Sequence, residues 1–340
     1  MVACRPLAAP PTPTAPVRIA IVASERGPHG ARLVAIDERG DRQLVLARAP
    51  VALARDTHPA ISPDGTQVVF ASSRDRPLDE TSLWIAPLGV DATPQRLTTG
   101  AAIDSHPTWS PDGTAIVFAS TRGGQGFDLW RLTLATHALE QLTTAEGHEI
   151  TPTVARDGSI IYAKVTQLAP DRVDSHLEVR APDGTITRLT DGPADSAPAL
   201  SPDGRTLAFA RPQLHGASPD ADLWLMSRAG GDATPIVEVP LTDEGGPVWS
   251  PDGRFVFATS VLRGETGAPI FSSVIFVDLR SAPRVARILE DHAGALARLT
   301  PAIARTPLDT AALAHDPEYL PELGRIMAKA IADQQRGDGP

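Results

Sequence analysis

Residues 107–122 read PTWSPDGTAIVFASTR, and this stretch decides the fold. Its Ser-Pro-Asp-Gly core at residues 110–113 recurs at residues 62–65, 201–204 and 250–253, and a degraded copy, Ala-Arg-Asp-Gly, lies at residues 155–158. The aspartates of successive copies are 48, 45, 46 and 49 residues apart. A repeat of this length, built from short strand-like segments, is typical of a β-propeller in which each repeat forms one four-stranded sheet.

Each repeat has the same order of segments around this turn. A short segment led by proline comes first, then the turn, an apolar strand, a polar loop, a third strand and a fourth strand that ends in Leu-Thr. Proline sets φ at the second turn position and glycine accepts positive φ at the last, so we expect positive φ at Gly113. Three segments rich in Asp and Pro are expected to be surface loops: residues 76–81, 168–175 and 213–222.

The repeats predict an all-β fold, a six-bladed propeller closed by a split blade. Residues 17–47 hold three strands without a leading turn, whereas residues 299–304 match the beginning of a repeat that does not continue. We expect this late strand to join the three early ones, because closure removes the exposed edges of an open sheet. The five full repeats begin near Pro59, Pro107, Pro152, Pro198 and Pro247.

This interpretation divides the chain into three parts. Residues 1–16 form a tail rich in Pro, Ala and Thr, residues 17–306 the propeller, and residues 307–340 a helical extension. Apolar residues at helical spacing predict a helix over residues 315–336 on the outside of the ring; they are Leu320, Leu323, Ile326, Met327 and Ile331. The tryptophans occupy repeat positions that predict packing between blades; they are Trp84, Trp109, Trp130, Trp224 and Trp249.

The repeats resemble the TolB-like β-propeller family. The family pattern is Pro-x-Trp-Ser-Pro-Asp-Gly, an apolar strand ending in Ser-x-Arg, a third strand and Leu-Thr, and residues 59–74 and 107–122 match it nearly residue for residue. TolB carries an additional α/β domain ahead of its propeller, so the resemblance covers the propeller alone. It implies a non-catalytic binding scaffold of the bacterial cell envelope, periplasmic or associated with the outer membrane, that grips a protein or peptide at the channel mouth.

Two other functions stay open. Similar repeats form the regulatory propellers of prolyl-oligopeptidase-type peptidases, so the chain could be such a propeller acting with a separate catalytic partner. It contains no Gly-x-Ser-x-Gly nucleophile elbow. The other alternative is a cation-assisted lyase or hydrolase that uses the central channel. An enzyme needs a base and an electrophile that converge on one pocket, which makes the non-catalytic function our first expectation.

Composition limits the classes of partner. The net charge of −10 argues against sequence-independent binding of nucleic acid, which depends on a basic surface. The sequence contains no run of 18 apolar residues, so it predicts no transmembrane helix. The single cysteine cannot form an intramolecular disulfide, and we expect a monomer.

That cysteine, Cys4, lies in a suggestive context. Val-Ala-Cys at residues 2–4 resembles the end of a bacterial lipoprotein signal, in which the cysteine becomes lipidated. The following residues, rich in Pro, Ala and Thr, resemble the tether behind such an anchor. The alternative is a disordered tail with an incidental cysteine.

An acid precedes each leading proline of the full repeats by three residues. These acids are Asp56, Asp104, Glu149, Asp195 and Glu244, and Arg298 takes the sixth position. Because first strands line the channel of a propeller, we expect these residues at one mouth. The ring could hold a hard cation such as calcium, or the basic end of a protein partner. His58 and His106, directly before two of the prolines, complete the predicted site.

Ion pairing within the blades is the competing explanation for these acids. Each blade also carries a base near the end of its second strand, at Arg26, Arg74, Arg122, Lys164, Arg211 and Arg263. Such bases could neutralise the acids by salt bridges, and a position repeated in every blade often serves the fold. The two histidines break the repeat, which makes them the better candidates for a functional role.

Overall fold

The computed structural model describes residues 19–27, 30–38, 42–44, 54–77, 79–89, 92–124, 126–169, 172–215, 218–239, 242–263, 269–289, 297–305, 307–313, 318, 321–322, 324–325 and 328. Cys4, the predicted tail and most of the segment at residues 315–336 lie outside these residues. The same holds for the predicted helix positions Leu320, Leu323, Ile326, Met327 and Ile331.

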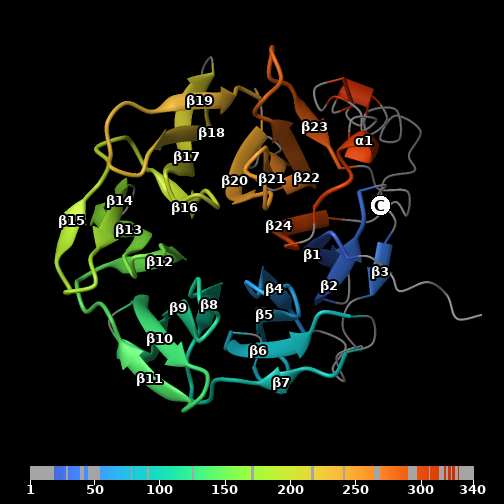
Figure 1. Ribbon diagram of the computed structural model, residues 1–340. Helices are drawn as coiled ribbons and strands as arrows, with labels where there is room; N and C mark the ends of the chain where they lie inside the picture. The colour runs from blue at the N-terminus through green and yellow to red at the C-terminus, as the bar shows by residue number, and fades with distance from the viewer. Residues whose placement is uncertain are drawn as a thin grey trace, which may run out of the picture.

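Six four-stranded antiparallel sheets surround a central channel (Figure 1). Each sheet is one blade, numbered from the first full repeat, and its first strand lies nearest the channel. Blade 1 contains β4 (Asp56–Ile61), β5 (Gln67–Ser72), β6 (Ser82–Pro87) and β7 (Gln95–Arg96). Blade 2 contains β8 (Asp104–Trp109), β9 (Ala115–Ser120), β10 (Asp128–Thr133) and β11 (Ala138–Gln141), with the short 3₁₀ helix η1 (Thr121–Gly123) after β9.

The next three blades follow in chain order. Blade 3 contains β12 (His148–Val154), β13 (Ile160–Ala169), β14 (Arg172–Arg180) and β15 (Ile186–Arg188). Blade 4 contains β16 (Ser196–Leu200), β17 (Thr206–His215), β18 (Ser218–Ser227) and β19 (Thr234–Val237). Blade 5 contains β20 (Thr242–Trp249), β21 (Phe255–Arg263), β22 (Pro269–Asp278) and β23 (Ala286–Ile288).

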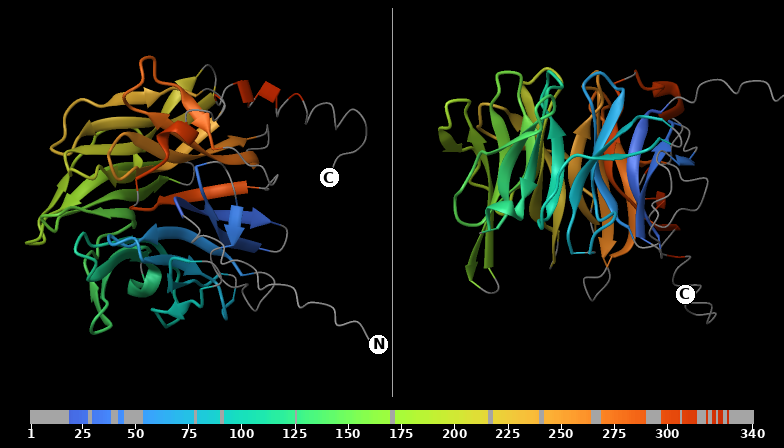
Figure 2. Two further views of the ribbon diagram at one scale, coloured as in Figure 1. Left: turned by 45° about the vertical axis from the view of Figure 1, so that its right-hand side comes forward. Right: turned by 90° about the horizontal axis from the view of Figure 1, so that it is seen from below.

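Blade 6 joins the two ends of the ring. Its innermost strand is the late β24 (Ala297–Ile303), followed by β1 (Ile21–Gly27), β2 (Gly30–Ile36) and β3 (Arg42–Leu44). Strands β24 and β1 are antiparallel, with Ile303 opposite Ile21, so the predicted split blade is confirmed. The right-hand view of Figure 2 shows the ring from the side, with the blades packed next to one another.

The Ser-Pro-Asp-Gly turn joins the innermost strand of a blade to its second strand. In blade 2 the Gly113 amide donates to the Ser110 carbonyl at 2.9 Å, and φ of Gly113 is 72°, positive as predicted. The Ser110 hydroxyl donates to Asp112 Oδ1 at 2.6 Å, and this oxygen also accepts from the Thr114 amide at 3.0 Å. These local side-chain bonds stiffen the corner.

A bulge interrupts each innermost strand at the residue before its leading proline. This residue has left-handed backbone geometry in every blade, with φ from 49° to 58°; the six are His58, His106, Thr151, Ala197, Gly246 and Thr300. The register to the second strand shifts at the same place, for example between Thr57 and Ala60. Backbone strain at a non-glycine residue of this kind costs about 1–3 kcal/mol. All six residues line the channel cavity.

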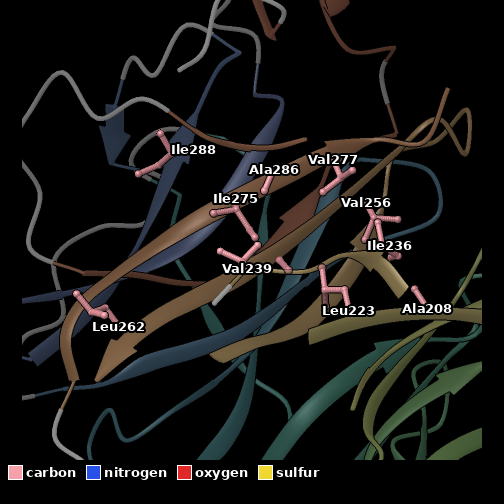
Figure 3. Close-up of a cluster of buried hydrophobic side chains, with 11 residues drawn as sticks. Ala208, Leu223, Ile236, Val239, Val256, Leu262, Ile275, Val277, Ala286 and Ile288 are labelled. Carbon is pink, nitrogen blue, oxygen red and sulfur yellow. The ribbon is translucent and has the colours of Figure 1, made fainter. Parts of the chain in front are cut away.

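Apolar side chains of neighbouring blades form the core. Figure 3 shows one such layer, in which Leu223 and Ile236 of blade 4 belong to the same buried cluster as Val256 and Ile275 of blade 5. The tryptophans pack in these layers as predicted. Trp109 also donates its indole N–H to the Ala60 carbonyl of the preceding blade at 3.0 Å, and Trp249 bonds Ala199 in the same way.

Two predicted loops are largely strands instead. Residues 168–175 and 213–222 fall mostly within the hairpins β13–β14 and β17–β18, where Gln167 pairs with Val173 and Gln213 with Asp220. At the C-terminal end, helix α1 (Thr310–Leu313) places Leu313 in the apolar cluster shared by blades 5 and 6. No helix of the described chain is both long enough and apolar enough to cross a membrane.

Candidate binding site in the central channel

The five predicted ring carboxylates lie inside the blades. Their residues are no more than 2% exposed, and none of them lines the channel cavity. The expectation that they line the channel mouth is therefore wrong. Four form ion pairs with a base of their own blade: Asp56 with Arg74, Asp104 with Arg122, Glu149 with Lys164, and Asp195 with Arg211. Pairing within the blade accounts for these four acids.

The Ser-x-Arg motif completes this ion pair in blade 1. Asp56 Oδ1 accepts from the Ser72 hydroxyl at 2.6 Å and from Arg74 Nε at 3.0 Å, while Arg74 Nη2 donates to Oδ2 at 2.6 Å. The guanidinium lies 5.5 Å from the centroid of the Phe70 ring and 6.0 Å from that of Trp84. A buried ion pair offsets its desolvation only when it is hydrogen-bonded this fully.

The Leu-Thr motif connects one blade to the next. The Thr98 hydroxyl at the end of blade 1 accepts from the Leu83 amide at 2.8 Å and donates to Asp104 Oδ2 of blade 2 at 2.6 Å. Thr143 forms the same bridge from blade 2 to Glu149 of blade 3, at 3.0 Å. Acid, Ser-x-Arg and Leu-Thr are therefore parts of one repeated structural unit.

Glu244 of blade 5 departs from this unit. Its Oε1 accepts from the Thr242 and Ser260 hydroxyls, each at 2.7 Å, and its buried Oε2 has no hydrogen-bond partner among the described residues. Arg263, the predicted partner of Glu244, forms its ion pair with Asp243 instead, so the predicted pair of Glu244 and Arg263 is wrong. Burial, with smaller contributions from the charges of two neighbouring aspartates, raises the pKa of Glu244 to about 9, which keeps the group protonated at neutral pH.

The charges at the sixth position are exchanged between strands. Arg298 of β24 lies opposite Glu25 of β1, whereas in blade 3 the acid Glu149 is on the innermost strand and the base Lys164 on the second. The Glu25 carboxylate accepts from Arg32 Nη2 at 2.7 Å. Arg26 is exposed, and the side chain of Arg298 lies outside the described part of the chain.

The channel contains a cavity of about 770 Å³, and the two predicted histidines lie at its polar floor. The His58 and His106 ring centroids are 4.0 Å apart. Burial lowers the pKa of His58 to about 4, and burial together with His58 lowers that of His106 well below 6.5, so both imidazoles are neutral at neutral pH. Three buried floor atoms have no hydrogen-bond partner among the described residues: His106 Nδ1, Thr151 Oγ1 and Thr300 Oγ1.

The walls of the cavity are apolar and its outer rim carries two arginines. Prolines and residues such as Ile61, Trp109 and Leu200 form the walls. The turn prolines of four blades reach the rim, and Arg156 and Arg305 take the equivalent places in blades 3 and 6. The sequence interpretation missed both arginines. Their signal was present in the two repeats whose Ser-Pro-Asp-Gly turn is degraded or incomplete.

The predicted calcium site has no geometric support. Within the described ranges, no group of three or more His, Cys, Asp or Glu side chains is arranged to hold a metal ion. The paired carboxylates direct their oxygens to hydroxyl and cationic groups of the blades, and the histidine pair lacks a nearby third ligand of these types. The arrangement is suited to hydrogen bonding and apolar contact with a ligand that enters the channel.

Solved structures share this architecture at low sequence identity. TolB from Acinetobacter baumannii aligns with a TM-score of 0.65 and 19% identity over 84% of this chain and 66% of its own, so the chain spans just under two thirds of that protein. A candidate TolB from Agrobacterium tumefaciens aligns with a TM-score of 0.60 and 19% identity over 84% of this chain and 94% of its own. Hydrazine synthase from Kuenenia stuttgartiensis aligns with a TM-score of 0.64 and 13% identity over 86% of this chain and 48% of its own. These likenesses concern the fold alone.

Sequence comparison identifies the family. No curated protein sequence matches the chain. A family model described as the TolB beta propeller domain matches residues 47–218, which is about half of the chain and spans the repeats of blades 1 to 3 and part of blade 4. With the repeated turn, the bulged inner strands and the closed ring of six blades, this match shows that the chain belongs to the TolB beta-propeller domain family.

Proposed function

We propose that this protein is a non-catalytic binding scaffold that holds an extended segment of a protein partner in its central channel. The observation that carries the proposal is the cavity of about 770 Å³, with apolar walls and unpartnered polar atoms at its floor. This volume lies in the range of about 300–1,000 Å³ typical of ligand sites. The rigid ring fixes the cavity in shape, so a partner segment loses little energy to rearrangement of the scaffold.

The same lining favours binding over catalysis. His58 and His106 are the titratable groups at the floor, and their pKa values are lowered by burial. No carboxylate lines the described cavity beside them to orient an imidazole, so a base and an electrophile do not converge there. The lyase or hydrolase alternative therefore has no observation in its favour.

Membership of the TolB beta-propeller family supports a place in the bacterial cell envelope, periplasmic or associated with the outer membrane. Cys4, outside the described residues, is the candidate lipid anchor. The expected basic partner depended on an exposed acidic ring. Since those acids are buried, the chemistry of the partner has to be inferred from the cavity lining.

Site-specific photo-crosslinking in envelope extract tests the proposal. A photoreactive residue at Thr108, on the channel wall, is compared with one at Ala138 on the outermost strand of the same blade. We expect the channel probe to capture one partner through a single mapped segment. Plugging the channel with Ala60→Trp and Ala199→Trp, from opposite blades, should abolish capture, and thermal melting checks that the plugged protein is folded.

Two outcomes would count against this function. Capture by both probes alike would show contact with the outside of the ring. Capture that survives in the folded, plugged variant would show that the partner does not enter the cavity.

A further inference from the structure

We propose that the channel is selective for an acidic peptide segment, whose carboxylate is held at the rim between Arg156 and Arg305. This inference rests on the proposed binding function and specifies the chemistry of the partner. It reverses the charge expected from the sequence, because a buried acidic ring cannot attract a basic partner as an exposed one would.

The two arginines occupy equivalent positions on opposite sides of the ring. Each lies five residues after the bulge residue of its innermost strand, Arg156 after Thr151 and Arg305 after Thr300. In the other four blades this position is the turn proline. Blades 3 and 6 are three blades apart, so they face each other across the channel (Figure 1). Two cationic groups therefore approach the rim from opposite sides.

Arg156 and Arg305 are the charged side chains among the described residues that line the cavity. No aspartate, glutamate or lysine is found among the described residues that line it, although the whole chain has a net charge of −10. Arg156 Nη2 donates to the Pro202 carbonyl at 3.2 Å, and no ion pair joins Arg156 or Arg305 to a carboxylate in the described structure. Burial and, to a smaller extent, the positive charge of Arg156 lower the pKa of Arg305.

The aspartates of the neighbouring turns do not neutralise this charge from within the cavity. Asp64, Asp112, Asp203 and Asp252 each accept from the serine hydroxyl of their own turn at 2.6 Å. None of the four belongs to the cavity lining. The rim is therefore locally cationic in an acidic protein, which is an arrangement suited to bind a carboxylate by charge-assisted hydrogen bonds.

The depth of the cavity sets the length of the segment. Arg156 follows Thr151 by five residues, three of them in β12 and two beyond its end, so floor and rim are at most about 16 Å apart at about 3.3 Å per residue. An extended peptide of about five residues spans this distance. Its tip would lie against the histidine and threonine residues of the floor, its middle against the apolar walls, and its acidic residue beside the rim arginines. The occupant is thus a short amphipathic segment with an acidic residue about five positions from its tip.

Selection of displayed random heptapeptides on the intact protein tests this inference. The wild-type protein is compared with Arg156→Gln/Arg305→Gln and with the charge-reversed Arg156→Glu/Arg305→Glu. A matched control, Arg131→Gln/Arg188→Gln, removes two arginines from the third and outermost strands of blades 2 and 3. The plugged Ala60→Trp/Ala199→Trp protein reports binding outside the cavity, and thermal melting confirms that each variant is folded.

We expect wild-type and control proteins to select peptides with Asp or Glu at one fixed position. The charge-reversed variant should select Lys or Arg there. A selected acidic peptide should bind the Gln variant about tenfold more weakly, with a smaller dependence on salt. Peptides that bind the wild-type protein but not the plugged one, and that show no preference for Asp or Glu, would overturn the inference while the binding function stands. The same holds if the acidic preference persists in the Gln variant. Absence of any peptide that distinguishes the wild-type from the plugged protein would overturn both.

Discussion

At the scale of single residues, Glu244 is a buried carboxyl group without a base, and its protonation predicts a pH dependence of stability. Its pKa is about 9 in the folded protein and near 4.5 when exposed. Between these values the folded protein holds one more proton than the unfolded chain. The free energy of unfolding should therefore fall as pH rises through this window, by up to about 1.4 kcal/mol per pH unit.

Glu244→Gln should remove this component, because the amide still accepts from Thr242 and Ser260 but does not titrate. Urea unfolding at several pH values between 5 and 9 measures the slope. The exposed Glu140→Gln, on the outermost strand of blade 2, serves as control. Equal slopes in wild type and Glu244→Gln would show that the carboxyl group is ionised in the folded protein.

The histidine pair should give a dependence of opposite sign at lower pH. Since burial lowers the pKa values of His58 and His106, the unfolded chain binds more protons than the folded protein between about pH 4 and 6.5. Stability should therefore fall on acidification through this range, by at most about 1.4 kcal/mol per pH unit for each imidazole. His58→Asn/His106→Asn tolerates the left-handed backbone and should lose this slope.

His137→Asn is the matched control for the histidine pair. His137 is exposed and also has positive φ, 55°. Its replacement by asparagine therefore tests the effect of the same substitution on left-handed backbone at a site outside the channel. Acid unfolding followed by tryptophan fluorescence compares the three proteins. A double variant that retains the full acid slope would contradict the assignment of neutral, buried imidazoles.

The limits of sequence reasoning are visible at the same residues. The spacing of Asp56 and Arg74 was enough to propose their ion pair. Spacing alone could not decide where the side chains point, because the bulge at His58 shifts the alternation along the strand. His and Gly are enriched in left-handed geometry but Thr and Ala are not, and the bulge position holds all four types, so no single residue type marks it. The sequence interpretation missed Arg156 and Arg305 because they lie where the Ser-Pro-Asp-Gly turn is degraded or incomplete, and it assigned no role to the residue that replaces proline there.

At the scale of elements, the Ser-Pro-Asp-Gly turn predicts the result of a glycine substitution. Gly113 has φ of 72°, and a Cβ added there would meet Pro63 Cδ at 3.8 Å, an ordinary contact. The penalty for Gly113→Val is therefore backbone strain alone, about 1–3 kcal/mol. Gly89 has open space around an added Cβ and no positive φ, so Gly89→Val should cost nothing measurable. Chemical denaturation compares them, and equal stabilities would refute the strain.

Repeat position proved a better guide to elements than composition. The turn, the four-strand order and the split blade were all predicted from spacing. Residues 168–175 and 213–222 were expected to be loops because they contain Asp and Pro. They pair mainly as extended hairpins because the backbone hydrogen bonds of a long antiparallel pair outweigh weak local preferences. The bounds of such hairpins depend on tertiary context that residue types do not record.

At the scale of the whole molecule, closure by β24 should control cooperative folding. Ending the chain after Leu289 removes β24 and leaves β1 with an unpaired edge beside an open cavity. We expect this protein to aggregate or to melt without a sharp transition. Ending the chain after Leu313 keeps β24 and α1 but removes the bridge between Glu318 and Arg287, so we expect a sharp melting transition at a slightly lower temperature. A protein cut after Leu289 that elutes and melts like the parent would contradict the role of closure.

The exchanged charges of blade 6 have a consequence for synthesis on the ribosome. Strand β1 emerges early and β24 last, so at roughly 5–20 residues per second β1 waits on the order of tens of seconds for its partner. Each earlier innermost strand that passes would bring a carboxylate opposite Glu25, and like charges facing each other across a strand pair repel. Only β24 brings an arginine to that place. We therefore expect the reversed charges to keep the innermost position of blade 6 unpaired until β24 has been synthesised.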